Sequence, residues 1–114
     1  MEIKLRAAFT GMTWLPSWIA LTTSNLSPHL ILEDETINYK VMRAIRRPYA
    51  DIASVDFRKS WGTRNIILRF HDSSATFTGN VVSDEEARRG LAALREKGCA
   101  LSSRAAAFAD AASL

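Results

Sequence analysis

Basic side chains concentrate in the middle of the chain and could bind an anion. Residues 39–64 hold seven basic and two acidic residues, a local charge of +5, whereas the whole chain carries +3. If the strands that carry them are neighbours, their side chains meet at one rim and attract phosphate, an acidic peptide or anionic membrane. The alternative is that they keep a sheet edge soluble. The candidate binding residues are Arg43, Arg46, Arg47, Arg58, Lys59 and Arg64.

Three tryptophans could form contacts with a partner. Trp14 and Trp18 lie close to Phe9, and this group could enter a membrane interface or seal a homodimer. The alternative is that the group covers one end of the core, which is the usual role of large aromatic side chains. Trp61 stands in a strand turn beside Gly62, where it is either a packed corner or an exposed contact residue. We take Trp14, Trp18 and Trp61 as candidate association residues.

Residues that could support catalysis are few. His29 and His71 fall at strand ends with no Asp or Cys in a recognisable catalytic arrangement, and Asp72 is merely adjacent to His71. Cys99 is the only cysteine, so no internal disulfide forms and no zinc or haem spacing exists. No glycine-rich phosphate loop is present. The sequence therefore predicts a protein that is not an enzyme and has no cofactor and no metal.

Size, composition and charge favour a single-domain protein located in the cytoplasm. The chain has 114 residues, 47% hydrophobic and 24% charged, which is an ordinary globular balance. Its low net charge does not favour nucleic-acid binding, although Tyr39 and Tyr49 lie among the basic residues. Residues 7–32 carry no charge, but they are too polar for a membrane span and lack a cleavage site for a signal peptide. Peripheral attachment at the inner membrane face is the alternative location.

Hydrophobic alternation with period two predicts seven strands that would position these residues. In the third strand Ile37, Tyr39 and Val41 point inward, and in the fifth Val55 and Phe57 alternate with outward Asp56. Pro48 marks the fourth strand as an edge. The predicted strands are Glu2–Phe9, His29–Glu33, Thr36–Met42, Ile45–Tyr49, Ile52–Arg58, Asn65–His71 and Ala75–Val81.

A helix follows the last strand. Ser83 is its predicted N-cap, with Glu86 in the capping-box position and Gly98 as the stop. Ala87, Leu91 and Leu94 form the apolar stripe. Gly90 lies on the same face, where a close approach to the sheet would explain a residue that costs about 1 kcal/mol in a helix. On the solvent side Glu85 and Arg89 form a favourable pair.

Two segments are predicted less sharply. Residues 10–26 are expected to form a short helix or an irregular apolar segment. Residues 102–114 are rich in alanine and can form a helix by propensity. They can bury little, so we expect a frayed or partner-dependent tail. The prediction is one domain over 1–101 followed by a tail over 102–114.

In the order of its strands and helix, and in three short motifs, the chain resembles bacterial pleckstrin-homology-like (PH-like) domains over about 70 residues. The opening hairpin Leu30-Ile31-Leu32-Glu33-Asp34-Glu35-Thr36-Ile37-Asn38-Tyr39 is similar to theirs. So is Arg47-Pro48-Tyr49-Ala50-Asp51-Ile52-Ala53-Ser54-Val55, a basic and aromatic segment that ends in Asp-Ile-x-x-Val. Ser83-Asp84-Glu85-Glu86 then opens the helix. The resemblance implies an α+β, mainly β fold: a bent barrel of about seven antiparallel strands capped by one C-terminal helix.

For function the resemblance implies a binding or scaffold module. The lipid-binding members place a Lys and a spaced Arg pair around the first hairpin, but here that turn is the acidic pair Asp34-Glu35, which repels phosphate. We therefore expect a non-catalytic module that binds another protein or a second copy of itself. The alternative is peripheral binding to anionic membrane through the basic group of residues 43–64.

Overall fold

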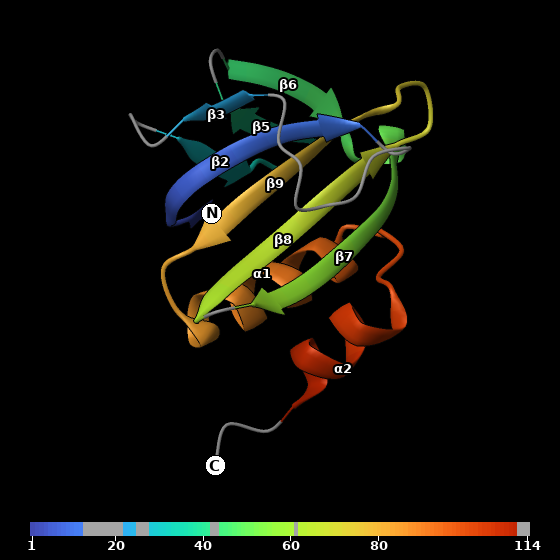
Figure 1. The fold of residues 1–114 in the computed structure, drawn as a ribbon. Helices are drawn as coiled ribbons and strands as arrows, with labels where there is room; N and C mark the ends of the chain where they lie inside the picture. The colour runs from blue at the N-terminus through green and yellow to red at the C-terminus, as the bar shows by residue number, and fades with distance from the viewer. Residues whose placement is uncertain (13–21, 25–27, 42–43, 61, 112–114) are drawn as a thin grey trace.

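Two antiparallel sheets and two helices make up the structure (Figure 1). The computed structural model describes residues 1–12, 22–24, 28–41, 44–60 and 62–111. A single 3-10 turn, Tyr49–Asp51, separates the sixth and seventh strands. The strands and helices are β1 (Glu2–Ile3), β2 (Leu5–Met12), β3 (Thr22–Ser24), β4 (His29–Leu32), β5 (Thr36–Lys40), β6 (Ala44–Pro48), β7 (Ile52–Ser60), β8 (Thr63–Phe70), β9 (Ala75–Val81), α1 (Asp84–Glu96) and α2 (Ser103–Asp110).

The strands form one sheet of four and one of five. The order is β1-β4-β5-β6 in the first and β3-β2-β9-β8-β7 in the second, and every neighbouring pair is antiparallel. The mainly β class with a helix after the last strand is thus confirmed. The described strands close no barrel, and they number nine rather than seven, because two of the elements differ from expectation.

The first expected strand, Glu2–Phe9, is two strands in different sheets. Ile3 pairs with Leu30 in the four-stranded sheet, whereas Leu5 pairs with Val81 in the five-stranded sheet. A bulge between Leu5 and Ala7 then shifts the pairing by one residue. Because side chains alternate with period two, this shift buries Ala8 instead of the expected Ala7.

The segment expected to be irregular or helical is partly strand. Residues 10–12 continue β2 along β9, and Thr22–Ser24 forms β3 on the other side of β2, where Phe9 pairs with Thr23. The prediction for residues 10–26 is wrong over these two stretches. Its remainder, 13–21 and 25–26, lies outside the described residues.

Helix α1 begins as predicted, with one difference. The Ser83 hydroxyl accepts a hydrogen bond from the backbone N of Glu86 at 3.1 Å, which satisfies a free N–H of the first turn. The Glu86 carboxylate does not complete the capping box. It accepts instead from the backbone N of Lys4 at 3.0 Å and from Arg89, so Arg89 pairs with Glu86 and not with Glu85 as expected. Glu86 therefore ties the helix to the point where the chain changes sheet.

The end of α1 and its glycine are as the sequence predicts. Gly98 has a φ of +89°, and its N–H and that of Cys99 bond back to carbonyls of the last turn, which stops the helix. Gly90 faces the sheet so closely that a Cβ there would lie 2.6 Å from Cδ1 of Ile3. The close approach that we inferred for Gly90 is therefore confirmed.

The core lies between the sheets, and α1 closes one end of it. In Figure 1 this helix runs behind the β7–β8–β9 part of the five-stranded sheet. Ile37 and Val41 are buried, as expected from their inward phase. The largest fully buried side chains come from both sheets and the helix: Ile3, Leu30, Ile37, Ile66, Leu68, Phe77, Leu91 and Leu94.

The C-terminal segment folds against the domain, so the prediction that it frays and buries little is wrong. Residues 99–102 run parallel to β7, and the Val55 backbone bonds both to Ala100 and to Ser102 at 2.8 Å. Helix α2 follows with Ala105 fully buried. The Phe108 ring stacks on Phe57 with centroids 4.0 Å apart. An alanine-rich segment docks here because small residues allow its backbone to come close.

Candidate functional site

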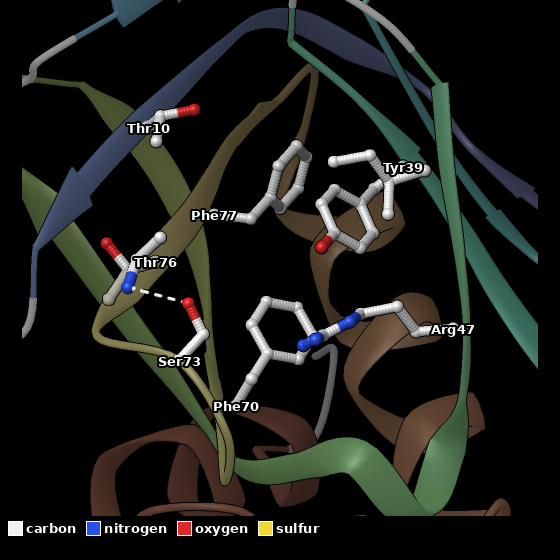
Figure 2. A pocket seen from close by; sticks show the side chains of 9 residues that line it. Thr10, Tyr39, Arg47, Phe70, Ser73, Thr76 and Phe77 are labelled. Carbon is white, nitrogen blue, oxygen red and sulfur yellow. Dashed lines mark hydrogen bonds between the residues drawn. The ribbon is translucent and has the colours of Figure 1, made fainter.

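A cavity opens at the end of the sandwich opposite to α1. Its volume is about 220 Å³, and it lies between the edge strand β6 and the facing strands of the other sheet (Figure 2). The lining is mainly apolar. The residues around it are Thr10, Tyr39, Ile45, Arg47, Phe70, Ser73, Ala75, Thr76 and Phe77.

Three aromatic rings form the inner wall of this cavity. Tyr39 on β5 stacks on Phe70 at the end of β8, with centroids 5.4 Å apart and planes at 20°. It also meets Phe77 of β9, with centroids 5.0 Å apart and planes at 53°. These separations are those of favourable aromatic pairs. Residues of the two sheets thus hold each other in place, and the wall is preformed.

The Tyr39 hydroxyl is the polar atom at the centre of this wall. The residue is only 9% exposed, and its hydroxyl points into the cavity (Figure 2). Burial raises the pKa of the phenol, so the group is neutral at physiological pH. No described residue forms a hydrogen bond with this oxygen. The oxygen is not one of the buried polar atoms of the described residues, so it is open to solvent at the cavity and accessible to a ligand.

Arg47 forms the side of the cavity next to β6. Its guanidinium carbon lies 4.5 Å from the centre of the Phe70 ring, a cation–π contact. One terminal nitrogen donates to both carboxylate oxygens of Asp72, at 2.9 and 3.0 Å, and Nε lies 3.8 Å from Asp51. The side chain is therefore fixed in place, and its charge is balanced by two carboxylates.

Strand β6 is the open edge of the four-stranded sheet. Among the described strands it pairs only with β5, where Tyr39 faces Ile45 and Ile37 faces Arg47. Most of its residues are exposed. Ile45 is 39% exposed, one of two large hydrophobic residues exposed in the described part of the chain, and it lies at the mouth of the cavity. Pro48 ends the strand, in agreement with its prediction as an edge.

The basic residues do not gather at one rim. Arg46 and Arg47 lie on β6, whereas Arg58, Lys59 and Arg64 lie beside the β7–β8 turn, at the opposite end of the view in Figure 1. Arg43 lies outside the described residues. A role of this group in binding stays a prediction.

Most of these charges are engaged by carboxylates. Arg46 donates to Glu33 at 2.7 Å, and the hydrogen bond lowers the pKa of that carboxyl. Lys59 and Arg64, which face each other across the β7–β8 pair, both donate to Asp84 in the first turn of α1. These pairs lower the pKa of Asp84 and leave less net positive charge at either place than the sequence suggested.

The other residues singled out from the sequence have structural partners, are exposed, as His71 is, or are not described. His29 shares a hydrogen bond of 2.9 Å with Asn38 on the neighbouring strand. Cys99 is buried, which raises the pKa of its thiol and makes it a poor nucleophile. Trp14, Trp18 and Trp61 lie outside the described residues.

Asp56 is a buried charged residue whose burial the sequence did not reveal. It was expected on the outer face, but it is 6% exposed because α2 covers it. Its Oδ1 accepts from the Ser102 hydroxyl at 2.6 Å and from Nε of Arg104 at 2.7 Å, and Oδ2 accepts from the second Arg104 nitrogen at 2.6 Å. These bonds hold the pKa of Asp56 far below its usual range. The network fastens α2 to β7.

In the described part of the chain, no group of three or more His, Cys, Asp or Glu residues could hold a metal ion. None of the helices there has the length and apolar character needed to cross a bilayer.

Comparison with models of known protein families and with curated proteins gave no match.

Among the cavity residues, sequence reasoning singled out only Arg47 as a candidate for binding. It placed Tyr39 on the inward face of its strand. The one signal available was Tyr39 itself, because an inward tyrosine needs a partner for its hydroxyl.

Proposed function

We propose that this protein is a non-catalytic binding module that takes an extended segment of another protein onto the open edge of β6. The observation that carries the proposal is the position of Ile45, which is 39% exposed beside an aromatic cavity, on a strand that pairs only with β5 among the described strands. An edge strand offers a row of free backbone N–H and C=O groups to an incoming strand. Main-chain bonds then supply affinity, and adjacent pockets supply specificity.

The proposed occupant is a strand of a different protein and not a second copy of this chain. Self-pairing of β6 would crowd the Arg46 and Arg47 side chains of two copies, each already held by a carboxylate, into one interface. Self-association through this edge is thus an outcome of the test below.

We also propose that the architecture is a variant of the PH-like fold. The β4–β5 hairpin and the Asp-Ile-x-x-Val segment stand in the expected order, and Ile52 and Val55 of that segment are buried. A helix follows the last strand and closes one end of the core. Strand β3 and helix α2 are additions to that pattern. A PH-like fold is compatible with protein binding and does not require it.

Peripheral binding to anionic membrane receives less support. Arg46, Lys59 and Arg64 each donate to a carboxylate, which reduces the charge available to lipid headgroups. We therefore advance protein binding as the function.

The test is selection of peptides from a random display library against the whole chain, followed by backbone hydrogen exchange by NMR. Strand addition should slow exchange at the amides of Ala44–Arg47, and Ile45→Lys should weaken the selected peptides at least tenfold. The matched control is Ala107→Lys, which places the same charge on exposed α2. Peptides that bind without protecting β6 would contradict the proposal. Protection that grows with the concentration of the chain alone would assign the edge to a second copy instead.

A further inference from the structure

We infer that the cavity beside β6 receives one ring-sized side chain with a hydrogen-bonding tip, of which tyrosine is the natural example, from the strand that adds to β6. This inference rests on the proposed function for the source of the ring. Three features of the cavity carry it: its size, its polar atoms and its position relative to the open edge.

Size limits the occupant to about one ring. The cavity has a volume of about 220 Å³. A dry apolar cavity of about 150 Å³ in another protein accepts benzene, whereas sites for whole small-molecule ligands run from roughly 300 Å³ upward. The present cavity is therefore large enough to receive a substituted ring.

Polar atoms of the wall favour a ring that can hydrogen-bond. The Tyr39 ring is largely buried, whereas its hydroxyl points into the cavity, where it is open to solvent and has no hydrogen-bond partner among the described residues. A phenol-type ring in the cavity would meet this hydroxyl well, because a phenol hydroxyl both donates and accepts. The Arg47 guanidinium, from the neighbouring strand of the same sheet, is a second donor at this cavity.

The position of the cavity allows an added strand to reach it. Ile45 is the direct cross-strand neighbour of Tyr39, so both side chains lie on the inner face of their sheet. A residue added opposite Ile45 presents its side chain on that same face. It lies two strand spacings, roughly 10 Å, from Tyr39, a gap that two long ring side chains can bridge.

The test uses the isolated side-chain analogues p-cresol and toluene, titrated into the isotopically labelled whole chain and followed by NMR. We expect p-cresol to shift the signals of Ile45 and Ala75 saturably, with a dissociation constant on the order of 1 mM. Tyr39→Phe keeps the ring and removes the hydroxyl. It should weaken p-cresol roughly fivefold, as expected for one lost hydrogen bond, and leave toluene within about twofold.

A filling variant separates the cavity from the rest of the surface. Ala75→Phe should abolish the shifts from both compounds, whereas the matched control Ala107→Phe on exposed α2 should leave them unchanged. No saturable shift with the unaltered chain would overturn the inference, and so would equal p-cresol affinity in Tyr39→Phe. Binding of p-cresol away from these residues would overturn it as well.

Binding of the peptides selected from the display library separates the ring site from strand addition. Selected peptides should carry a tyrosine at one fixed position and should lose affinity at least tenfold against Ala75→Phe. Peptides that protect β6 but bind Ala75→Phe as well as the unaltered chain would refute the inference and leave strand addition standing. Saturable p-cresol binding with no peptide that protects β6 would refute strand addition and assign the ring site to a free small molecule.

Discussion

Arg104 binds Asp56 through two parallel hydrogen bonds, Nε to Oδ1 at 2.7 Å and Nη2 to Oδ2 at 2.6 Å. Bidentate pairs of this kind are stronger than single neutral hydrogen bonds. The carboxylate is buried on β7 and the guanidinium belongs to α2, so one contact joins the C-terminal helix to the edge of the five-stranded sheet.

The Asp56–Arg104 pair makes the free energy of unfolding depend on pH in the acidic range. The pKa of Asp56 is depressed in the folded protein, so its contribution is complete above its ordinary value of about 3.9. The contribution is lost as the pH falls below that value toward the folded pKa, because the unfolded chain takes up the proton first. Urea unfolding from about pH 7 to about pH 2 should therefore show a declining midpoint below about pH 4. Asp56→Asn should be less stable near neutrality and should show a flatter pH dependence. Equal slopes for the two proteins would contradict this account.

Phe108 should decide whether α2 stays docked. Its ring stacks on Phe57 on one side, and the Arg88 guanidinium lies 4.5 Å from its centre. Phe108→Ala should lower the free energy of unfolding by about 2 kcal/mol, less than a fully buried phenylalanine would cost. Hydrogen exchange should accelerate in 103–110 far more than in β5. Ala107→Ser, on the exposed side of the same helix, is the control, and uniform acceleration through the whole chain would argue against local undocking.

Gly90 and Ile3 should show a coupled effect on stability. Gly90→Ala gains about 1 kcal/mol of helix propensity, but its Cβ would meet Cδ1 of Ile3 at 2.6 Å. We expect Gly90→Ala to be destabilising in the normal chain and close to neutral or stabilising with Ile3→Val, which lacks that atom. Denaturation of the four proteins gives the coupling energy directly. Additive effects would show that α1 can move away from β1 freely.

Tyr49 should titrate unusually late. Its hydroxyl donates to the carbonyl of Glu33, and burial followed by nearby negative groups raises the pKa of Tyr49 to about 12. The neutral form is favoured in the folded state, so its stabilisation is complete below about pH 10 and is lost between about pH 10 and pH 12. Absorbance of tyrosinate should rise with a midpoint near 12 in the folded protein, and Tyr49→Phe should remove that phase. A midpoint at about 10 would refute the buried, bonded hydroxyl.

The alternation of apolar and polar residues predicted the strands well where that alternation is regular. Strand β9 has the predicted bounds, and Tyr39 is inward as its phase required. The bulge after Leu5 was not readable, because it is a property of the pairing with β9 and not of the residues of β2.

The candidate site could be predicted only in part. Arg47 was named as a binding residue, but the cavity beside it depends on how far apart the two sheets stand, and no local pattern encodes that distance. Asp56 was placed on the correct outward phase. Its burial depends on the docking of α2, which an alanine-rich sequence with one phenylalanine did not reveal.

The chain passes from one sheet to the other at Lys4, and this crossing limits how early the N-terminal strands can fold during synthesis. β1 pairs with β4, β2 pairs with β9, and the amide of Lys4 is satisfied by Glu86 of α1. Strands β1 and β2 therefore depend on partners that are synthesised later in the chain. We expect nascent chains that stop before β9 to remain incompletely folded, and contacts this distant in sequence to make folding slow.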